Sequence, residues 1–128
     1  MPHLLSLTVL QPLLAIARFP PQSGLPWWAA TSSFLSFTRT PDEDSLVCEE
    51  ARVPEGETAQ RGFRAMRVNG TLQFHLTGVL ASLTTPLADA AVPVFVVSTY
   101  DTDYLLVEES VLPKAIEALR KAGHTVSA

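Results

Sequence analysis

Short apolar blocks separated by proline and polar residues dominate the first half of the chain, and this pattern predicts strands rather than long helices. The expected strands span residues 4–10, 13–19, 34–38 and 46–48. Pro12 separates the first two, because proline can end a strand but cannot donate a hydrogen bond within a central one. Thr40, followed by acidic residues up to Asp44, predicts one capped helical turn. The polar stretch 49–61 is expected to be a linker.

The second half alternates more regularly between strand and helix patterns. Strands are expected at 63–68, 92–97, 103–107 and 125–126, and helices at 78–91 and 110–122. Leucines in the first helix recur at steps of three or four, and Pro86 inside it predicts a kink or an early end. Ser110 is the expected cap of the second helix, and Gly123 its end. The segment 72–77 has no clear pattern.

These elements predict an α+β protein. Strand, helix, strand, strand, helix, strand is the ferredoxin-like βαββαβ order, which has an antiparallel sheet with both helices on one face. The run 94–97 does not alternate, so both faces of its strand are expected to be buried. The first half or a second copy must then cover the face that lacks helices. We therefore expect two ferredoxin-like modules, a degenerate one at 1–61 and a complete one at 62–128.

Composition and charge narrow the classes of partner. With 128 residues, 47% of them hydrophobic and 17% charged, the chain suits one compact domain or two very small ones. The net charge is −4 and the cations do not cluster, which argues against nucleic acid as a partner. No apolar run approaches the ~18 residues of a membrane span, and the first residues lack the basic region of a signal peptide. A cytoplasmic protein without membrane contact is expected.

No pattern of catalytic or metal-binding residues stands out. Cys48 is the only cysteine, which excludes an internal disulfide and a thiolate zinc site. The three histidines, His3, His75 and His124, share no ligand-type spacing. Neither a Gly-x-Ser-x-Gly motif nor a glycine-rich phosphate loop occurs. The sequence therefore predicts no catalytic residues, no metal and no cofactor, and the protein is not expected to be an enzyme.

Four segments together carry a resemblance to a known family. They are Phe34-Leu-Ser-Phe-Thr-Arg-Thr-Pro-Asp-Glu-Asp-Ser-Leu-Val-Cys48, Thr77-Gly-Val-Leu-Ala-Ser82, Pro86-Leu-Ala88 and Val97-Ser-Thr-Tyr-Asp-Thr-Asp-Tyr-Leu-Leu-Val107. This set resembles the small bacterial tandem-ACT proteins and the eukaryotic cytosolic arginine sensor. It is more distantly similar to the regulatory ACT domains of aspartate kinases. The resemblance implies two ACT modules that bind a small effector, mostly an amino acid, at an interface between modules, and a homodimer to complete that arrangement.

The resemblance also implies a set of ligand-binding residues. It places the ligand near the turn before the first helix of a module, against strand ends of another module. By motif, the residues carried over are Gly78, Val79, Val94, Thr99, Tyr100 and Asp103. Pro93 departs from the serine of the sensor and supplies neither a hydroxyl nor an N–H. Physically, Gly78 at a helix start lets a carboxylate approach free amides, and Asp103 can take an amino or guanidinium group.

Two readings of function remain open at this point. The first is an amino-acid-binding regulatory protein without catalysis, whose ligand stiffens or reorients the interface between modules. The alternative is a ligand-free module for protein–protein interaction or oligomerisation, which explains the expected buried strand equally well. Ordinary turn chemistry explains Asp101 without a ligand, and it accounts for Asp103 as well as binding does.

Overall fold

The computed structural model describes residues 3–71 and 76–128. Residues 72–75 of the unassigned segment, His75 among them, lie outside the described residues. The chain forms two compact units. The N-terminal unit is Pro12–Phe63, and the C-terminal unit combines Met1–Gln11 with Arg64–Ala128. The expected division into modules 1–61 and 62–128 stays a prediction, while the compact units group residues 1–11 with 64–128.

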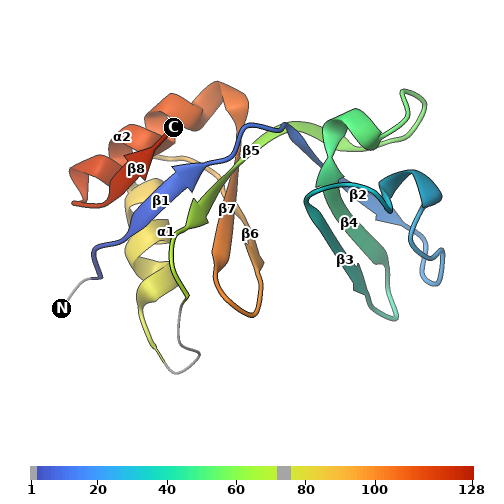
Figure 1. Cartoon of the computed structure of the whole chain (residues 1–128), viewed down its shortest axis with the longest axis horizontal. Coiled ribbons are helices and arrows are strands. Elements are labelled where there is room, and N and C mark those ends of the chain that lie inside the picture. Colours follow the sequence, from blue (N-terminus) through green and yellow to red (C-terminus); the bar gives the residue numbers. More distant parts are fainter. Residues whose placement is uncertain (1–2, 72–75) are drawn as a thin grey trace. The chain divides into compact units, whose positions relative to one another are not determined.

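The C-terminal unit is a sheet covered by two helices (Figure 1). Its elements are β1 (Ser6–Val9), β5 (Gln60–Val68), α1 (Val79–Asp89), β6 (Phe95–Ser98), β7 (Asp103–Glu108), α2 (Leu112–Lys121) and β8 (Thr125–Ser127). The strands lie in the order β6-β7-β5-β1-β8, and β1 is antiparallel to β5 and parallel to β8. This is the βαββαβ order with β1 inserted between the first and last strands. The α+β, ferredoxin-like prediction is confirmed.

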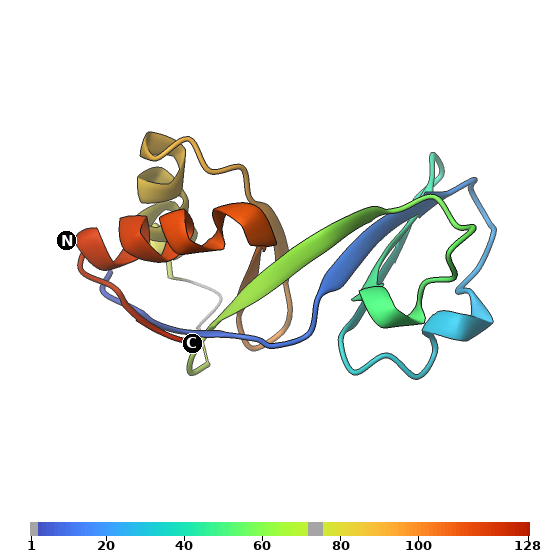
Figure 2. The ribbon, with the colours of Figure 1, turned by 90° about the horizontal axis from the view of Figure 1, so that it is seen from above.

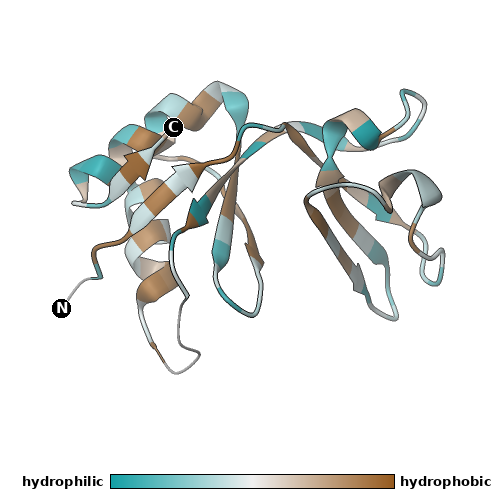
Figure 3. Ribbon diagram, viewed as in Figure 1, coloured by the Kyte–Doolittle hydropathy of each residue, from teal (hydrophilic) through white to brown (hydrophobic). Residues whose placement is uncertain are grey.

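One core joins the helices of the C-terminal unit to its sheet. Figure 2 shows α1 and α2 on the same side of the strands. Leu83 and Leu87 of α1 and Leu119 of α2 are fully buried with Met66 of β5. Along α2, hydrophobic and hydrophilic residues alternate at helical spacing (Figure 3). The buried apolar side of each helix therefore holds its first turn at a defined place beside the sheet.

The N-terminal unit is a small sheet that carries only short 3-10 turns in its described residues. Its elements are β2 (Leu14–Phe19), η1 (Trp27–Ala29), β3 (Leu35–Arg39), β4 (Asp44–Glu49) and η2 (Glu50–Arg52), and the start of β5 completes the order β3-β4-β2-β5. Ala29 and Trp28 of η1 pack on its core, with the rings of Phe19 and Trp28 6.4 Å apart. This turn takes the place of a module helix, as expected for a degenerate copy.

Two local predictions are wrong. The segment Pro41–Asp44 is not a helical turn: Thr40 and Glu43 close a hairpin turn, with the Thr40 N–H 2.9 Å from the Glu43 carbonyl oxygen, and Asp44 begins β4. Ser110 does not cap α2. It lies in the 3-10 turn η3 (Glu109–Val111), whose backbone leads directly into the helix. Pro113 in the first turn of α2 has no N–H, so this position needs no capping acceptor.

The strand predicted at 92–97 is shorter and less buried than expected. β6 begins at Phe95, whose exposure is 39%, and it pairs with β7 on one side within the described residues. A single chain therefore leaves part of this strand in contact with water. The predicted linker 49–61 is instead partly structured, since it contains the turn η2 and the first residues of β5. In the described ranges, no helix is long and apolar enough to cross a membrane.

Candidate ligand-binding site

The β6–β7 hairpin places several polar groups at one edge of the C-terminal unit. Ser98 and Asp103 are cross-strand partners, and the Ser98 hydroxyl donates to Oδ1 of Asp103 at 2.5 Å. The turn between them closes through Thr99, whose N–H lies 2.8 Å from the Thr102 carbonyl oxygen. Thr102 is buried, and its hydroxyl donates to the Val68 carbonyl oxygen at 2.7 Å, which fixes the turn to the end of β5.

The start of α1 supplies the opposite side of the site. Gly78 precedes the helix with φ +79°, a left-handed conformation that side chains with a Cβ rarely adopt. The backbone N–H groups of the first helical turn have no partner within the helix, and they carry the positive end of the helix dipole. The His3 imidazole lies 2.9 Å from the Thr77 carbonyl oxygen, so the residue before Gly78 is also held in place.

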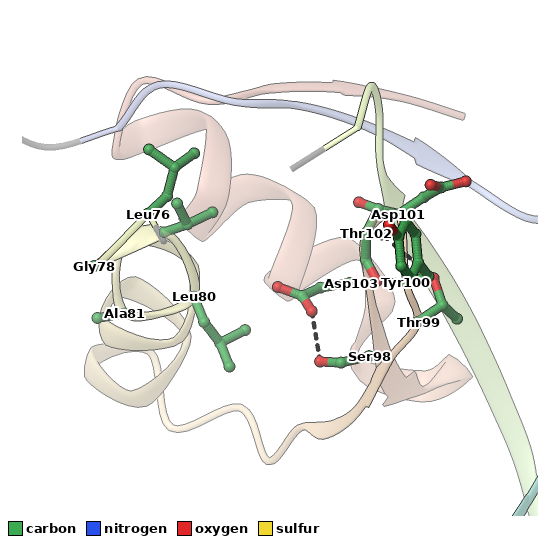
Figure 4. A pocket seen from close by; sticks show the side chains of 11 residues that line it. Leu76, Gly78, Leu80, Ala81, Ser98, Thr99, Tyr100, Asp101, Thr102 and Asp103 are labelled. Carbon is green, nitrogen blue, oxygen red and sulfur yellow. Dashed lines mark hydrogen bonds between the residues drawn. The ribbon is translucent and has the colours of Figure 1, made fainter. Parts of the chain in front are cut away.

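A pocket of about 320 Å³ lies between these two elements (Figure 4). Its walls are the first turn of α1 on one side and the hairpin on the other. The lining residues are Leu76, Gly78, Val79, Leu80, Ala81, Ser98, Thr99, Tyr100, Asp101, Thr102 and Asp103. In Figure 4 the Asp103 carboxylate points toward the first turn of α1. The Ser98 hydroxyl holds this carboxylate in place on the pocket wall.

The structure brings together five of the six residues that the sequence singled out. Gly78, Val79, Thr99, Tyr100 and Asp103 all line the pocket. Val94 does not, because it packs against the hydrophobic core of the C-terminal unit.

Sequence reasoning missed the apolar wall formed by Leu76 and Leu80. Leu80 sits on the first turn of the helix that follows Gly78, and this position was the signal that could have found it. No pattern marked Leu76, which falls in the segment whose conformation the sequence left open.

The two walls of the pocket differ in their electrostatic character. Among the described residues, Asp101 and Asp103 are the charged side chains that line it, and no lysine, arginine or histidine of the described ranges does so. The amide groups at the start of α1 provide positive potential on the other wall. Across residues 3–71 and 76–128, no three histidine, cysteine or acidic side chains gather as a metal site would require. The pocket therefore has a wall with two carboxylates opposite a wall of helix N-terminal amides.

Comparison with known proteins agrees with this architecture. A family model described as ACT domain matches residues 58–121. The chain belongs to the ACT family. A second model, described as an N-terminal domain, matches residues 13–56. ACT domains generally bind amino acids in regulatory roles and commonly dimerise.

Three relatives show how far this chain resembles known proteins in sequence and in fold. A crystal structure of a protein from Agrobacterium tumefaciens superposes with a TM-score of 0.90 at 35% identity, covering 97% of this ACT chain and 92% of that one. The regulatory subunit of aspartate kinase from Thermus thermophilus shares the fold, with a TM-score of 0.60 at 10% identity, covering 88% of this chain and 92% of that one. The human protein CASTOR3P is 30% identical over 93 residues, which are 62% of this chain and 57% of the human protein. The chain therefore spans just over half of that relative.

Proposed function

We propose that this protein is a non-catalytic sensor that binds a free amino acid in the pocket between α1 and the β6–β7 hairpin. The observation that carries the proposal is the convergence of the Asp103 carboxylate and the first-turn amides of α1 on one pocket. The pocket volume of about 320 Å³ is at the small end of the range for ligand sites, which suits a molecule as small as an amino acid.

The two ends of an amino acid match the two walls. Its carboxylate would accept hydrogen bonds from the backbone N–H groups after Gly78, where the helix dipole favours negative charge. An amino or guanidinium group would donate to Asp103, a charge-assisted bond that is stronger than a neutral one. Thr99 and Tyr100 would border the ligand, and Val79 would contact its apolar part.

A homodimer is part of this proposal. Val94 lies outside the pocket of its own chain, so its proposed contact with the ligand requires a second copy. The exposed β6 strand, with Phe95 39% exposed, supports such an assembly, because a single chain leaves apolar surface there. A ligand held between copies would regulate by stabilising one arrangement of them over another. We further propose that the protein acts in the cytoplasm.

Thermal unfolding of dialysed protein against each proteinogenic amino acid tests the proposal. A ligand at one hundred times its dissociation constant stabilises the folded state by about 2.7 kcal/mol, which raises the midpoint by several degrees. Asp103→Ala should abolish the shift. Asp42→Ala is the matched control, since it removes an exposed hairpin aspartate outside the pocket and should retain the shift. Absence of any shift with ligand-free wild-type protein would refute amino-acid sensing.

A second candidate, a ligand-free oligomerisation module, is favoured by the same exposed strand. Phe95→Lys would place a charge on the β6 surface. If assembly is the function, this variant should be monomeric by light scattering while Asp103→Ala assembles as the wild type does. A wild-type protein that is monomeric at all concentrations, with and without amino acids, would exclude this candidate.

A further inference from the structure

The β3–β4 hairpin of the N-terminal unit repeats the β6–β7 hairpin of the C-terminal unit. The strands β4 and β7 are both six residues long, and each begins with aspartate and ends with glutamate. Each carries three successive buried residues, 46–48 in β4 and 105–107 in β7. Each is followed by a 3-10 turn that starts with glutamate. Asp44 in one unit therefore occupies the position of Asp103 in the other.

The two turns close in the same way. In the N-terminal hairpin, Thr40 bonds to Glu43: its N–H donates to the carbonyl oxygen at 2.9 Å, and its Oγ1 lies 3.1 Å from the Glu43 nitrogen. In the C-terminal hairpin, Thr99 makes the equivalent bonds to Thr102 at 2.8 Å and 3.3 Å. The repetition thus includes the hydrogen bonds that set the position of the aspartate that follows.

The two aspartates differ in what surrounds them. Asp44 is fully buried, and its Oδ2 accepts the backbone N–H of Gly24 at 2.8 Å. Among the described residues its Oδ1 accepts no hydrogen bond, and Nε of the mostly exposed Arg39 lies 4.0 Å away. Asp103 is only partly buried and faces a pocket. In the N-terminal unit a backbone N–H bonds the aspartate, whereas in the C-terminal unit the Ser98 hydroxyl bonds Oδ1 of Asp103 and the carboxylate faces the pocket.

We propose that the N-terminal hairpin is a second copy of the ligand-binding hairpin whose aspartate is occupied by the chain's own Gly24 amide, so that each chain holds one free site. Gly24 has φ +81°, which lets the loop after β2 turn its amide onto the carboxylate. Burial of Asp44 is tolerated because a hydrogen bond to the charged form offsets part of the cost of desolvation.

The occupied copy also indicates the chemistry of the free one. A carboxylate at this position accepts from a nitrogen donor in the N-terminal unit. A ligand at Asp103 should likewise present an N–H donor, such as an ammonium or guanidinium group. This part of the inference rests on the proposed function, whereas the occupation of Asp44 does not.

Amide hydrogen exchange with backbone NMR assignment tests the inference on the whole chain. In the wild type, the Gly24 amide should be protected, and Asp44→Ala should raise its exchange rate at least tenfold relative to the amides of α1. Asp44→Asn keeps an acceptor oxygen and should retain part of the protection, which keeps the test usable if the alanine variant does not fold. An unprotected Gly24 amide in the wild type would overturn the inference.

Titration with each amino acid, followed in the same spectra, tests the number of sites. We expect shifts at Gly78 and Thr99, none at Gly24 or Thr40, and one ligand per chain. Two ligands per chain, or shifts at Gly24, would also overturn the inference. If no amino acid shifts any resonance, the proposed function fails. The protection of the Gly24 amide then still shows whether that amide is hydrogen-bonded to the Asp44 carboxylate.

Discussion

The Nε2 atom of His124 lies 2.9 Å from the carbonyl oxygen of Ser82, the helical carbonyl that Pro86 leaves without its usual donor. In an α-helix the N–H of residue 86 would bond to that oxygen, but proline has no N–H. Nδ1 of the same imidazole accepts the backbone N–H of Leu5 at 3.1 Å. The backbone amide can only donate, so the proton of the neutral ring belongs on Nε2, which donates to Ser82. His124 thus ties α1 to the N-terminal segment.

Removal of this imidazole should destabilise the C-terminal unit. His124→Ala leaves the partly buried Leu5 N–H and Ser82 carbonyl without this partner, and a fully buried unsatisfied group costs about 1–3 kcal/mol, which is the upper bound here. Urea unfolding should therefore show a lower midpoint for this variant. His3→Ala is the control, because that side chain is more exposed and bonds a single carbonyl.

The coupling between His124 and Pro86 is a sharper test of the same contact. Pro86→Ala restores an N–H to the helix, so Ser82 would no longer depend on His124. His124→Ala should then lower the free energy of unfolding by less in the Pro86→Ala background than in the wild type. If the changes in unfolding free energy are additive in a double-mutant cycle, the two residues act independently.

Gly78 should be intolerant of alanine for a backbone reason. A Cβ there would have room, with its nearest neighbour, His3 Cδ2, 4.0 Å away. The left-handed backbone is the obstacle, and Gly78→Ala should cost about 1–2 kcal/mol. Gly56→Ala is the matched control, since Gly56 has open space and no left-handed φ. Equal unfolding midpoints for the two variants would contradict this explanation.

Cys48 should be unreactive in the native protein. Burial raises the pKa of its thiol, and the neighbouring Glu49 carboxylate raises it further, so little of the reactive thiolate is present. Because it is the only cysteine, a thiol reagent reports on it alone. Labelling should be slow in buffer and complete in denaturant. Rapid labelling of the folded protein, with the same rate in both conditions, would show that Cys48 is accessible.

Glu49 should make the stability of the N-terminal unit depend on pH. The backbone N–H of Ser33, 2.8 Å from Oε1, holds the pKa of Glu49 below its ordinary value, with help from the Ser32 and Ser33 side chains and from Arg52. A carboxylate whose pKa is lower in the folded state stabilises that state at neutral pH. The contribution is lost as the pH falls from the ordinary glutamate range through the lowered pKa.

Unfolding midpoints measured from neutral to acidic pH test this prediction. Glu49→Gln should be less stable than the wild type at neutral pH. On acidification, its stability should fall by less than that of the wild type. Glu55→Gln, which changes an exposed carboxylate nearby, should follow the wild-type curve. A Glu49→Gln curve that runs parallel to the wild type would rule out the linkage.

Local patterns were sufficient for most of the elements, and the family resemblance supplied most of the pocket residues. The alternation in 34–38 and the apolar run in 103–107 predicted strands that the structure contains as β3 and β7. Gly78 and the motif around Asp103 were expected to face each other across two modules, whereas in the structure they line one pocket within the C-terminal unit. The predicted elements depend on periodicity and on turn residues, which act over a few positions.

Only the tertiary structure decided which strands pair and which side chains pack against one another. β1 pairs with β5 and β8, although an entire unit separates it from β5 in the chain. Val94 was grouped with the pocket by motif, yet it packs against the core. The sequence by itself determined the type of most strands and helices, because short-range backbone preferences set them, whereas the Pro41–Asp44 turn and the segment 49–61 departed from those preferences. Pairing, burial and the occupation of Asp44 by Gly24 depend on long-range contacts, whose energies appear only when the chain is folded.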